Sequence, residues 1–259
     1  MIVNLTFDVE EFDFPMERGI DIDFDNQLSV STEGLASILV LLTKHDVKAT
    51  FYVTANYALH KPEIIKEIQL LGHEIASHDF YHAIGSKSAP EDAKIVLEQI
   101  TGAAVIGFRA PRLAKTSAAA LLAAGYLYNS SMNPTFIPFR YNNLFKPRTI
   151  FKEDGMIQYP ASVSWPFRIP LFWISFHVIP IGFYSKLAYS ALKKDGHLNL
   201  YFHPWEFSAQ LTDKRFGVPA YISNCSGSKL LHKLEELIRR LKNKGCTFQT
   251  TKKYLGFDA

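Results

Sequence analysis

Short apolar runs alternate with segments of helical periodicity along most of this chain, and this alternation is what most limits its fold. Apolar runs rich in β-branched and aromatic residues predict strands at Ile2–Asp8, Lys48–Thr54, Glu74–Ser77, Ala104–Arg109, Tyr126–Asn129, His197–His203 and Thr247–Thr250. Between them, apolar residues three and four positions apart predict helices at Thr32–His45, Lys61–Leu71, Pro90–Gly102, Ser117–Ala124, Tyr184–Lys194 and Lys229–Lys244. Strands that are regularly followed by helices indicate a parallel sheet.

We therefore expect one α/β domain spanning residues 1–259. Six or seven strand–helix units suit a closed or nearly closed barrel better than an open sheet, so the expected fold is a distorted (β/α)-barrel of six to seven parallel strands. The segment from about 132 to 180 is rich in prolines and aromatic residues and predicts an irregular insertion. Because such barrels carry their chemistry at the carboxyl ends of the strands, functional residues are expected there.

Composition and charge exclude some classes of partner. Apolar residues make up 47% of the chain and charged residues 20%, which is the balance of a protein with a sizeable core. The net charge of +3 is small, and the basic residues from Lys233 to Lys244 have helical spacing and include two glutamates. This pattern indicates the solvated face of a helix, so we expect no nucleic-acid partner.

Three features bear on location. Cys225 and Cys246 are too few for a disulfide framework and fit a reducing compartment. Residues 1–7 read as a first strand, not as a leader, so we expect a cytoplasmic protein. The most apolar stretch, from Ile169 to Tyr184, is too short and too interrupted by prolines to predict a transmembrane segment. It indicates either a buried insertion or a surface that touches lipid or a lipid-linked substrate, so membrane association stays open.

Two acidic residues follow the first strand. Alternation along an extended chain sends Asp8 and Glu10 to the same side. Two carboxylates on one face repel each other unless a cation or an arginine lies between them. The alternative is a solvated acidic turn, which fits Glu11, Glu17 and the run from Asp21 to Asp25. As a ligand, Glu10 is favoured over Glu11 by strand alternation, although both stay open.

A histidine pair follows the third predicted strand. His78 and His82 have the i, i+4 spacing that brings two side chains together on one face of a helical turn, where both imidazoles can bind one metal ion. Chance pairs are common among nine histidines, but this pair directly follows a strand. His73 opens that strand and is expected to be a core or rim histidine.

Two further strands end in basic side chains. Pro111 holds Ala110 extended, which fixes the direction in which Arg109 leaves its strand. A guanidinium there is a plausible partner for a buried carboxylate, whereas Arg112 is expected on the surface. His203 ends another apolar strand. A single histidine is more often structural, so its functional interpretation depends on the other motifs.

Together these motifs resemble the polysaccharide deacetylase family, also called the NodB-homology or carbohydrate esterase family 4, over about Ile2 to Thr250. The matching residues are Asp8-Val9-Glu10 for the first motif, His78 and His82 for the second, Arg109-Ala110-Pro111 for the third and Leu200–His203 for the fifth. The Pro-Trp-Glu after His203 is similar to relatives linked to exopolysaccharide synthesis. The chain departs from the family at Asn129, where the fourth motif usually has Asp.

The resemblance implies a NodB-like barrel that removes acetyl groups from an N-acetylated oligo- or polysaccharide, either free or lipid-linked. It implies that a divalent metal is bound by Glu10, His78 and His82, with Zn²⁺ expected first and Co²⁺, Ni²⁺ or Mn²⁺ as alternatives. It further implies that Asp8, held by Arg109, acts as the base and that His203 protonates the departing amine. The residues expected around the substrate are Pro111, Asn129, Trp205 and Glu206.

Some alternatives stay open at this level. In relatives the fourth-motif Asp is thought to support the acid histidine, so with Asn129 here either Glu206 or another acid substitutes, or His203 is a weaker acid. The same fold also hydrolyses other C–N bonds, such as those of acylated polyamines or cyclic amides. A non-catalytic glycan-binding protein is the third alternative, favoured only by Asn129. The sequence does not specify the oligomeric state.

Overall fold

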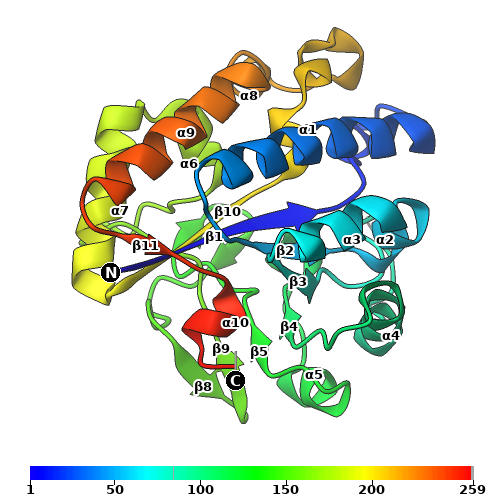
Figure 1. The fold of residues 1–259 in the computed structure, drawn as a ribbon, viewed down its shortest axis with the longest axis horizontal. Helices are drawn as coiled ribbons and strands as arrows, with labels where there is room; N and C mark the ends of the chain where they lie inside the picture. The colour runs from blue at the N-terminus through cyan, green and yellow to red at the C-terminus, as the bar shows by residue number, and fades with distance from the viewer. Residues whose placement is uncertain (84, 258–259) are drawn as a thin grey trace.

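A central, mostly parallel sheet organises the computed structural model, which describes residues 1–83 and 85–257 (Figure 1). Its strands are β1 (Ile2–Val9), β2 (Thr50–Val53), β3 (Glu74–Ser77), β4 (Gly107–Phe108), β5 (Tyr128–Asn129), β8 (Phe151–Glu153), β9 (Met156–Gln158), β10 (His197–Phe202) and β11 (Thr247–Phe248). They follow the order β10-β1-β2-β3-β4-β5-β9-β8, and β11 pairs with the first residues of β1. Every neighbouring pair on this path is parallel except β8 with β9. The predicted α/β barrel of parallel strands is therefore confirmed.

Strand β1 has a parallel partner on each side. Thr6 is paired with Tyr201 of β10 on one side and with Thr50 of β2 on the other. Residues 3–9 are all buried, as expected for a parallel strand covered on both faces. The ring of Phe7 stacks on that of Phe51, with 5.2 Å between centroids. This packing fixes the end of β1, from which the acidic residues of the first motif emerge.

The barrel is closed by a loop rather than by a pair of regular strands. Between β9 and β10, the backbone N–H of Ser162 donates to the carbonyl of Asn199 at 2.9 Å. In return, the backbone N–H of Asn199 donates to Ser162 Oγ, also at 2.9 Å. These two bonds give the edge of β10 a partner where the ladder ends, which explains why the barrel is distorted.

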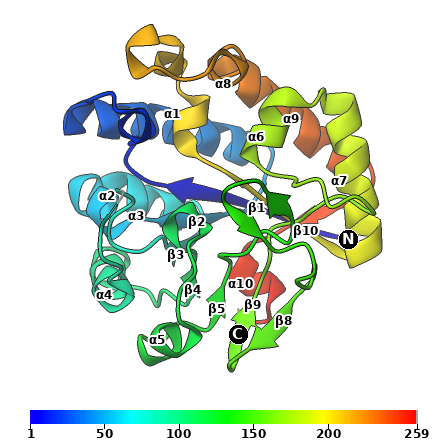
Figure 2. The ribbon, with the colours of Figure 1, turned by 180° about the vertical axis from the view of Figure 1, so that it is seen from behind.

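Helices surround the sheet on its outer side (Figure 2). Helices α1, α7 and α9 lie along β1 and β10, while α2 to α5 follow the strands from β2 to β5. The helices are α1 (Phe24–Lys44), α2 (Ala55–His60), α3 (Pro62–Leu70), α4 (Pro90–Thr101), α5 (Ala118–Ala123), α6 (Trp173–Val178), α7 (Ile181–Asp195), α8 (Ala220–Ser223), α9 (Ser228–Lys242) and α10 (Thr251–Tyr254). Within the described residues, no helix has both the length and the apolar character needed to cross a bilayer.

The first helix is longer than the sequence predicts. It begins at Phe24 and not at Thr32, because the Asp23 side chain accepts the backbone N–H of Asn26 at 2.8 Å and caps it there. A Cβ on Gly34 of this helix would lie 1.8 Å from the carbonyl oxygen of Pro204. Only glycine therefore lets α1 pack against the turn that follows β10.

The segment from 132 to 180 is more regular than predicted. It forms a hairpin of β6 (Phe136–Ile137) and β7 (Tyr141–Asn142), a second hairpin of β8 and β9, and helix α6. Strand β9 joins the main sheet beside β5. These strands have two or three residues each, too few for alternation to reveal them in the sequence.

Candidate active site

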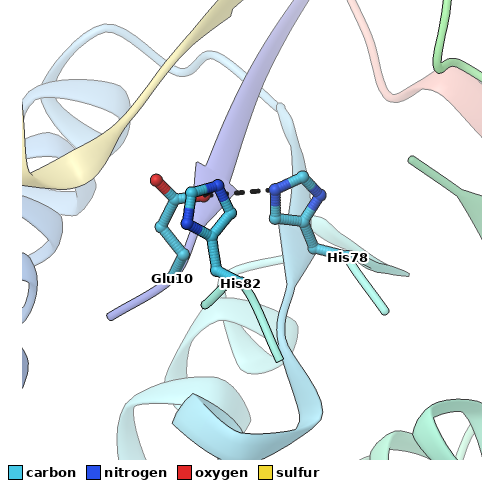
Figure 3. Close-up of side chains that lie close together, drawn as sticks. All are labelled: Glu10, His78 and His82. Atoms are coloured by element: carbon cyan, nitrogen blue, oxygen red, sulfur yellow. Dashed lines mark hydrogen bonds and ion pairs between the residues drawn. The ribbon is translucent and has the colours of Figure 1, made fainter. Parts of the chain in front are cut away.

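Glu10, His78 and His82 converge at the carboxyl end of the sheet (Figure 3). Glu10 Oε2 lies 3.2 Å from Nε2 of His78 and 3.2 Å from Nε2 of His82. The two imidazole rings are 5.7 Å apart between centroids, and all three side chains are buried. Two imidazoles and one carboxylate at this spacing form a set of ligands that can hold one divalent metal ion.

The two histidines meet in a loop and not on a helical turn, so the predicted reason for their proximity is wrong. After β3, the backbone N–H of His78 donates to the carbonyl of Val53 at 2.8 Å, which continues the sheet register. Asp79 then has a left-handed backbone, with φ of 63°. Its carboxylate accepts the backbone N–H groups of Phe80 and Ala89, both at 2.8 Å. This local hydrogen bonding folds the loop so that His82 returns to face His78.

Each histidine is held from behind by an acceptor. His78 Nδ1 lies 2.8 Å from the carbonyl oxygen of Arg109, and His82 Nδ1 lies 2.8 Å from Oδ1 of Asp13. Oδ2 of Asp13 also accepts a hydrogen bond from Nη2 of Arg112 at 3.0 Å. The sequence interpretation missed Asp13 and placed Arg112 on the surface, but Arg112 is half-buried against this carboxylate. The spacing of Asp13, three residues after Glu10, was the available signal.

This donor set fits a metal ion. With Nδ1 of both histidines bonded to acceptors, each Nε2 faces Glu10 and is the atom that, once deprotonated, can bind a metal ion. Burial lowers the pKa of His82, but Glu10 and Asp13 outweigh it and raise that pKa above its usual value. The same negative field favours a divalent cation between the three side chains. Three protein ligands leave open positions for water and substrate, as in catalytic sites.

Glu11, the acidic residue that follows Glu10, points away from the candidate metal ligands. Glu11 is buried and accepts hydrogen bonds from Thr54 Oγ1 at 3.1 Å and Asn56 Nδ2 at 2.5 Å. Burial raises the pKa of its carboxyl group. The expectation that Glu11 belongs to a solvated turn is wrong, and it is Glu10 that lies beside both imidazoles.

Asp8 and Arg109 form a buried ion pair next to the candidate metal ligands. Arg109 Nη1 lies 2.5 Å from Oδ1 of Asp8, and Arg109 has no exposed surface. The guanidinium also donates to Thr6 Oγ1 and to the carbonyl and hydroxyl of Ser130, and it lies 4.0 Å above the centre of the Tyr52 ring. A buried arginine with this many partners holds the Asp8 carboxylate in a fixed position.

His203 lies on the other side of the site, held by Glu206. Strand β10 ends, and a 3₁₀ turn over Pro204–Phe207 folds the Glu206 carboxylate back onto His203 Nδ1, at 2.9 Å. The other oxygen of Glu206 lies 2.9 Å from Nε2 of His177, a residue of α6 that the sequence interpretation missed. Burial lowers the pKa of His203, but Glu10 and Glu206 outweigh it and raise the pKa to about 9.

With Asn129 in place of the family Asp, the sequence left open which acid supports His203. The side-chain oxygen of Asn129 accepts the backbone N–H of Ser131 at 3.1 Å, so it is engaged in its own loop. Glu206 supplies the carboxylate that contacts His203. Its burial, complete in this structure, places it behind the histidine and not against a substrate.

These side chains share one cavity of about 370 Å³. Among the predicted site residues, its wall includes Asp8, Glu10, His78, His82, His203 and Trp205. Arg109 and Glu206 support the wall from behind. Pro111 lines a neighbouring hollow, and Asn129 is buried in its loop. The aromatic rings of Phe172, Trp173 and Tyr201 complete the wall near His203.

Comparison with known proteins agrees with this site. Residues 3–129 match the family model described as polysaccharide deacetylase, and this range includes every candidate metal ligand and Arg109. A chitooligosaccharide deacetylase of Bradyrhizobium sp. (strain ANU 289) is 35% identical over 75 residues, which cover 29% of this chain and 33% of that protein. The match thus spans about a third of the length of that relative.

Solved structures extend the likeness in fold over nearly the whole chain. A Mycobacterium smegmatis protein assigned as a polysaccharide deacetylase superposes with a TM-score of 0.64 at 20% identity, covering 98% of this chain and 88% of that one. A Pseudomonas aeruginosa PAO1 protein with a similar assignment gives 0.66 at 13% identity, covering 97% and 88%. At this identity the superpositions establish the fold alone. Residues 3–129, which carry the motifs of the site, are thus similar to the polysaccharide deacetylase family.

Proposed function

We propose that this protein is a metal-dependent hydrolase that removes acetyl groups from N-acetylated sugars of a cell-surface or exported polysaccharide, or of its precursor. The observation that carries the proposal is one cavity whose wall holds three candidate metal ligands, a fixed carboxylate at Asp8 and an imidazole at His203. Deacetylation needs a polarised carbonyl, a base for water and an acid for the departing amine. The cavity offers a group for each.

Glu10, His78 and His82 would hold the metal ion, with Zn²⁺ as the first choice for two imidazoles and one carboxylate. When bound there, the ion would supply Lewis acidity toward the acetyl carbonyl and lower the pKa of a water molecule. Co²⁺, Ni²⁺ and Mn²⁺ suit the same nitrogen and oxygen donors.

Asp8 would take the proton from the attacking water. Its position is fixed by the buried ion pair with Arg109. Arg109 keeps its charge at any working pH, so it orients the carboxylate without competing for the proton. A base whose geometry is fixed before substrate arrives gains from that orientation.

His203 would give a proton to the nitrogen of the departing amino sugar. Glu10 and Glu206 both raise its pKa, and Glu206 still does so when a cation offsets the charge of Glu10, which favours the protonated imidazole; its Nδ1 is occupied by Glu206. Nε2 is then the atom that can donate into the cavity. Protonation of the nitrogen prevents it from returning to the carbonyl carbon.

The test is acetate release from a panel of N-acetylated oligosaccharides, both soluble and lipid-linked, with acylated polyamines and cyclic amides as competing substrates. We expect release from at least one glycan by the wild type and a loss of about 10³-fold in His78→Ala and Asp8→Asn. His232→Ala, on the exposed face of α9, is the matched control and should retain full activity. Equal acetate release by the wild type and both site variants would refute the mechanism.

Metal content separates the proposal from a glycan-binding function. After purification with added Zn²⁺, the wild type and Asp8→Asn should each carry about one ion per chain by elemental analysis, and His78→Ala should carry much less. A wild-type protein that binds oligosaccharide but holds no metal would favour the binding protein instead. Release from a polyamine or cyclic amide alone would favour the other C–N bond hydrolase.

A further inference from the structure

The tripeptide Pro-Phe-Arg occurs twice, at residues 138–140 and 166–168, and each copy forms the tip of a hairpin. The first tip joins β6 to β7. The second lies between 164 and 169, where the backbone N–H of Ser164 donates to the carbonyl of Ile169 at 2.8 Å. Each tip contains a non-glycine residue with a left-handed backbone, Phe139 with φ of 62° and Arg168 with φ of 55°. Such conformations are retained where the surrounding structure holds them.

Phenylalanine side chains project from these tips into solvent. The exposed fractions are 110% for Phe139, 80% for Phe167 and 94% for Phe145, which follows the first hairpin. They are the most exposed aromatic side chains in the part of the chain that the structure describes. A side chain without any polar atom gains nothing from full contact with water, so three of them in one region mark an interaction surface.

Hydrogen bonds hold the second tip against the base of the first hairpin. Arg168 Nη1 donates to the carbonyl oxygens of Pro134 at 3.0 Å and Lys146 at 2.9 Å. Thr135 Oγ1 donates back to the carbonyl oxygen of Arg168 at 2.7 Å. The second tip is therefore fixed against the two segments that flank the first hairpin, next to Phe145.

The same surface borders the candidate active site. Ile137, Arg140 and Tyr141 of the first hairpin contribute to the wall of the catalytic cavity. Phe139 lies between Ile137 and Arg140 in the chain, and its exposure shows that its side chain faces solvent. A surface that docked on the two tips would lie at the edge of the cavity mouth.

Positive charge is concentrated in this part of the molecule. Residues 132–194 include eight lysines and arginines and two acidic residues, whereas the rest of the chain has 20 basic and 23 acidic residues. Lys194 Nζ lies 4.7 Å from the centre of the Trp165 ring, beside the second tip. Lys194 also lines a groove of about 870 Å³ between α7 and α9, whose wall has five lysines and arginines and no carboxylate.

We propose that the two Pro-Phe-Arg tips dock this protein on the surface of an anionic phospholipid bilayer. The phenylalanines enter the boundary between headgroups and acyl chains, and the surrounding lysines and arginines face lipid phosphates. The phenylalanines of the tips are solvent-exposed and have no hydrogen-bonding atom, which suits insertion into lipid better than recognition of a glycan. A second copy of the same basic surface would be repelled. This inference goes beyond the proposed deacetylation and does not depend on it.

The test is co-sedimentation of the full chain with vesicles of phosphatidylcholine alone and of phosphatidylcholine mixed with phosphatidylglycerol. We expect binding to the mixed vesicles that weakens as salt is raised, because part of the attraction is screened. In Phe139→Ser/Phe167→Ser the partition onto vesicles should fall by about tenfold or more. The matched control is Val40→Ser/Leu70→Ser, which removes two exposed apolar side chains on α1 and α3, 71% and 86% exposed, and should bind as the wild type does.

Several outcomes would overturn the proposal. They are an absence of vesicle binding, equal binding to neutral and anionic vesicles, or equal loss in the two double variants. Binding to a soluble anionic polysaccharide in place of vesicles would assign the surface to a glycan instead. Because all four substituted side chains are solvent-exposed, thermal unfolding should show both variants folded. His78→Ala should bind vesicles like the wild type, so a failure of the enzymatic proposal leaves this measurement intact.

Discussion

Two clusters in this molecule have the same composition, one glutamate between two histidines, and differ in where the protons lie. Glu10 stands between Nε2 of His78 and Nε2 of His82, and both histidines use Nδ1 to donate to acceptors behind them. Glu206 stands between His177 and His203 and is itself the acceptor for both rings.

The difference decides what each cluster can bind. Around Glu10, three sets of lone pairs converge, and only a cation or added protons can stabilise that arrangement. Around Glu206, each imidazole can place an N–H on one carboxylate oxygen, so the charge of this carboxylate is compensated from within the cluster, although Nδ1 of His177 has no hydrogen-bond partner among the described residues. The lesson is that His and Glu content alone does not identify a metal site; the direction of each N–H does.

The largest predicted effect separates the two clusters by metal content. Glu10→Gln removes the only carboxylate among the three candidate ligands, so bound Zn²⁺ should fall to near background and activity by about 10³-fold. Glu206→Gln keeps all three ligands and should retain about one ion per chain. Elemental analysis of both variants checks this, and equal metal loss from the two would remove the distinction.

A smaller effect concerns the pH dependence of activity. In the metal-free protein the acid form of His203 is present at neutral pH and is lost as the pH rises through about 9. A cation bound beside Glu10 cancels that residue's contribution, which leaves Glu206 as the main source of the shift. Glu206→Gln should lower kcat by about 10²-fold and move the alkaline limb of the profile to lower pH. If the alkaline limb of Glu206→Gln stayed where it is in the wild type, a group other than His203 would be the general acid.

The smallest predicted effect tests the acceptor behind His82. Asp13→Asn weakens the acceptor at His82 Nδ1, so the affinity for Zn²⁺ should fall by about tenfold with the fold unchanged. The control is Glu17→Gln, which touches Arg112 but neither histidine and should leave affinity unchanged. Titration against a competing chelator measures both. A similar loss in the two variants would show that only the net charge near Arg112 matters.

The sequence predicted the Glu10 cluster far better than the Glu206 cluster. Asp8, Glu10, His78, His82 and Arg109 each lie at or directly after a predicted strand, and parallel strands bring their carboxyl ends together. His203 could be found in the same way. His177 could not, because it comes from a short helix in a segment without clear periodicity, and Asp13 was hidden in a loop whose acidic residues resembled a solvated turn.

The two Pro-Phe-Arg tips are a second case in which the sequence did not predict a tertiary arrangement. The repeated tripeptide is visible in the sequence, and so is the excess of lysine and arginine around it. Nothing in the sequence brings the second copy to the base of the hairpin that carries the first, since 25 residues separate the two copies and the approach depends on hydrogen bonds from Arg168 to Pro134 and Lys146.

The sequence by itself determined the order of the longer strands and helices outside the segment from 132 to 180, the parallel sheet and the side chains that gather at its carboxyl end, because apolar periodicity is a local property of the chain. Tertiary structure alone decided which nitrogen of each histidine faces the cavity, which acid supports His203, and that Glu11 lies apart from the candidate metal site. Those outcomes depend on hydrogen bonds between residues distant in the chain, whose geometry exists only once the barrel is closed.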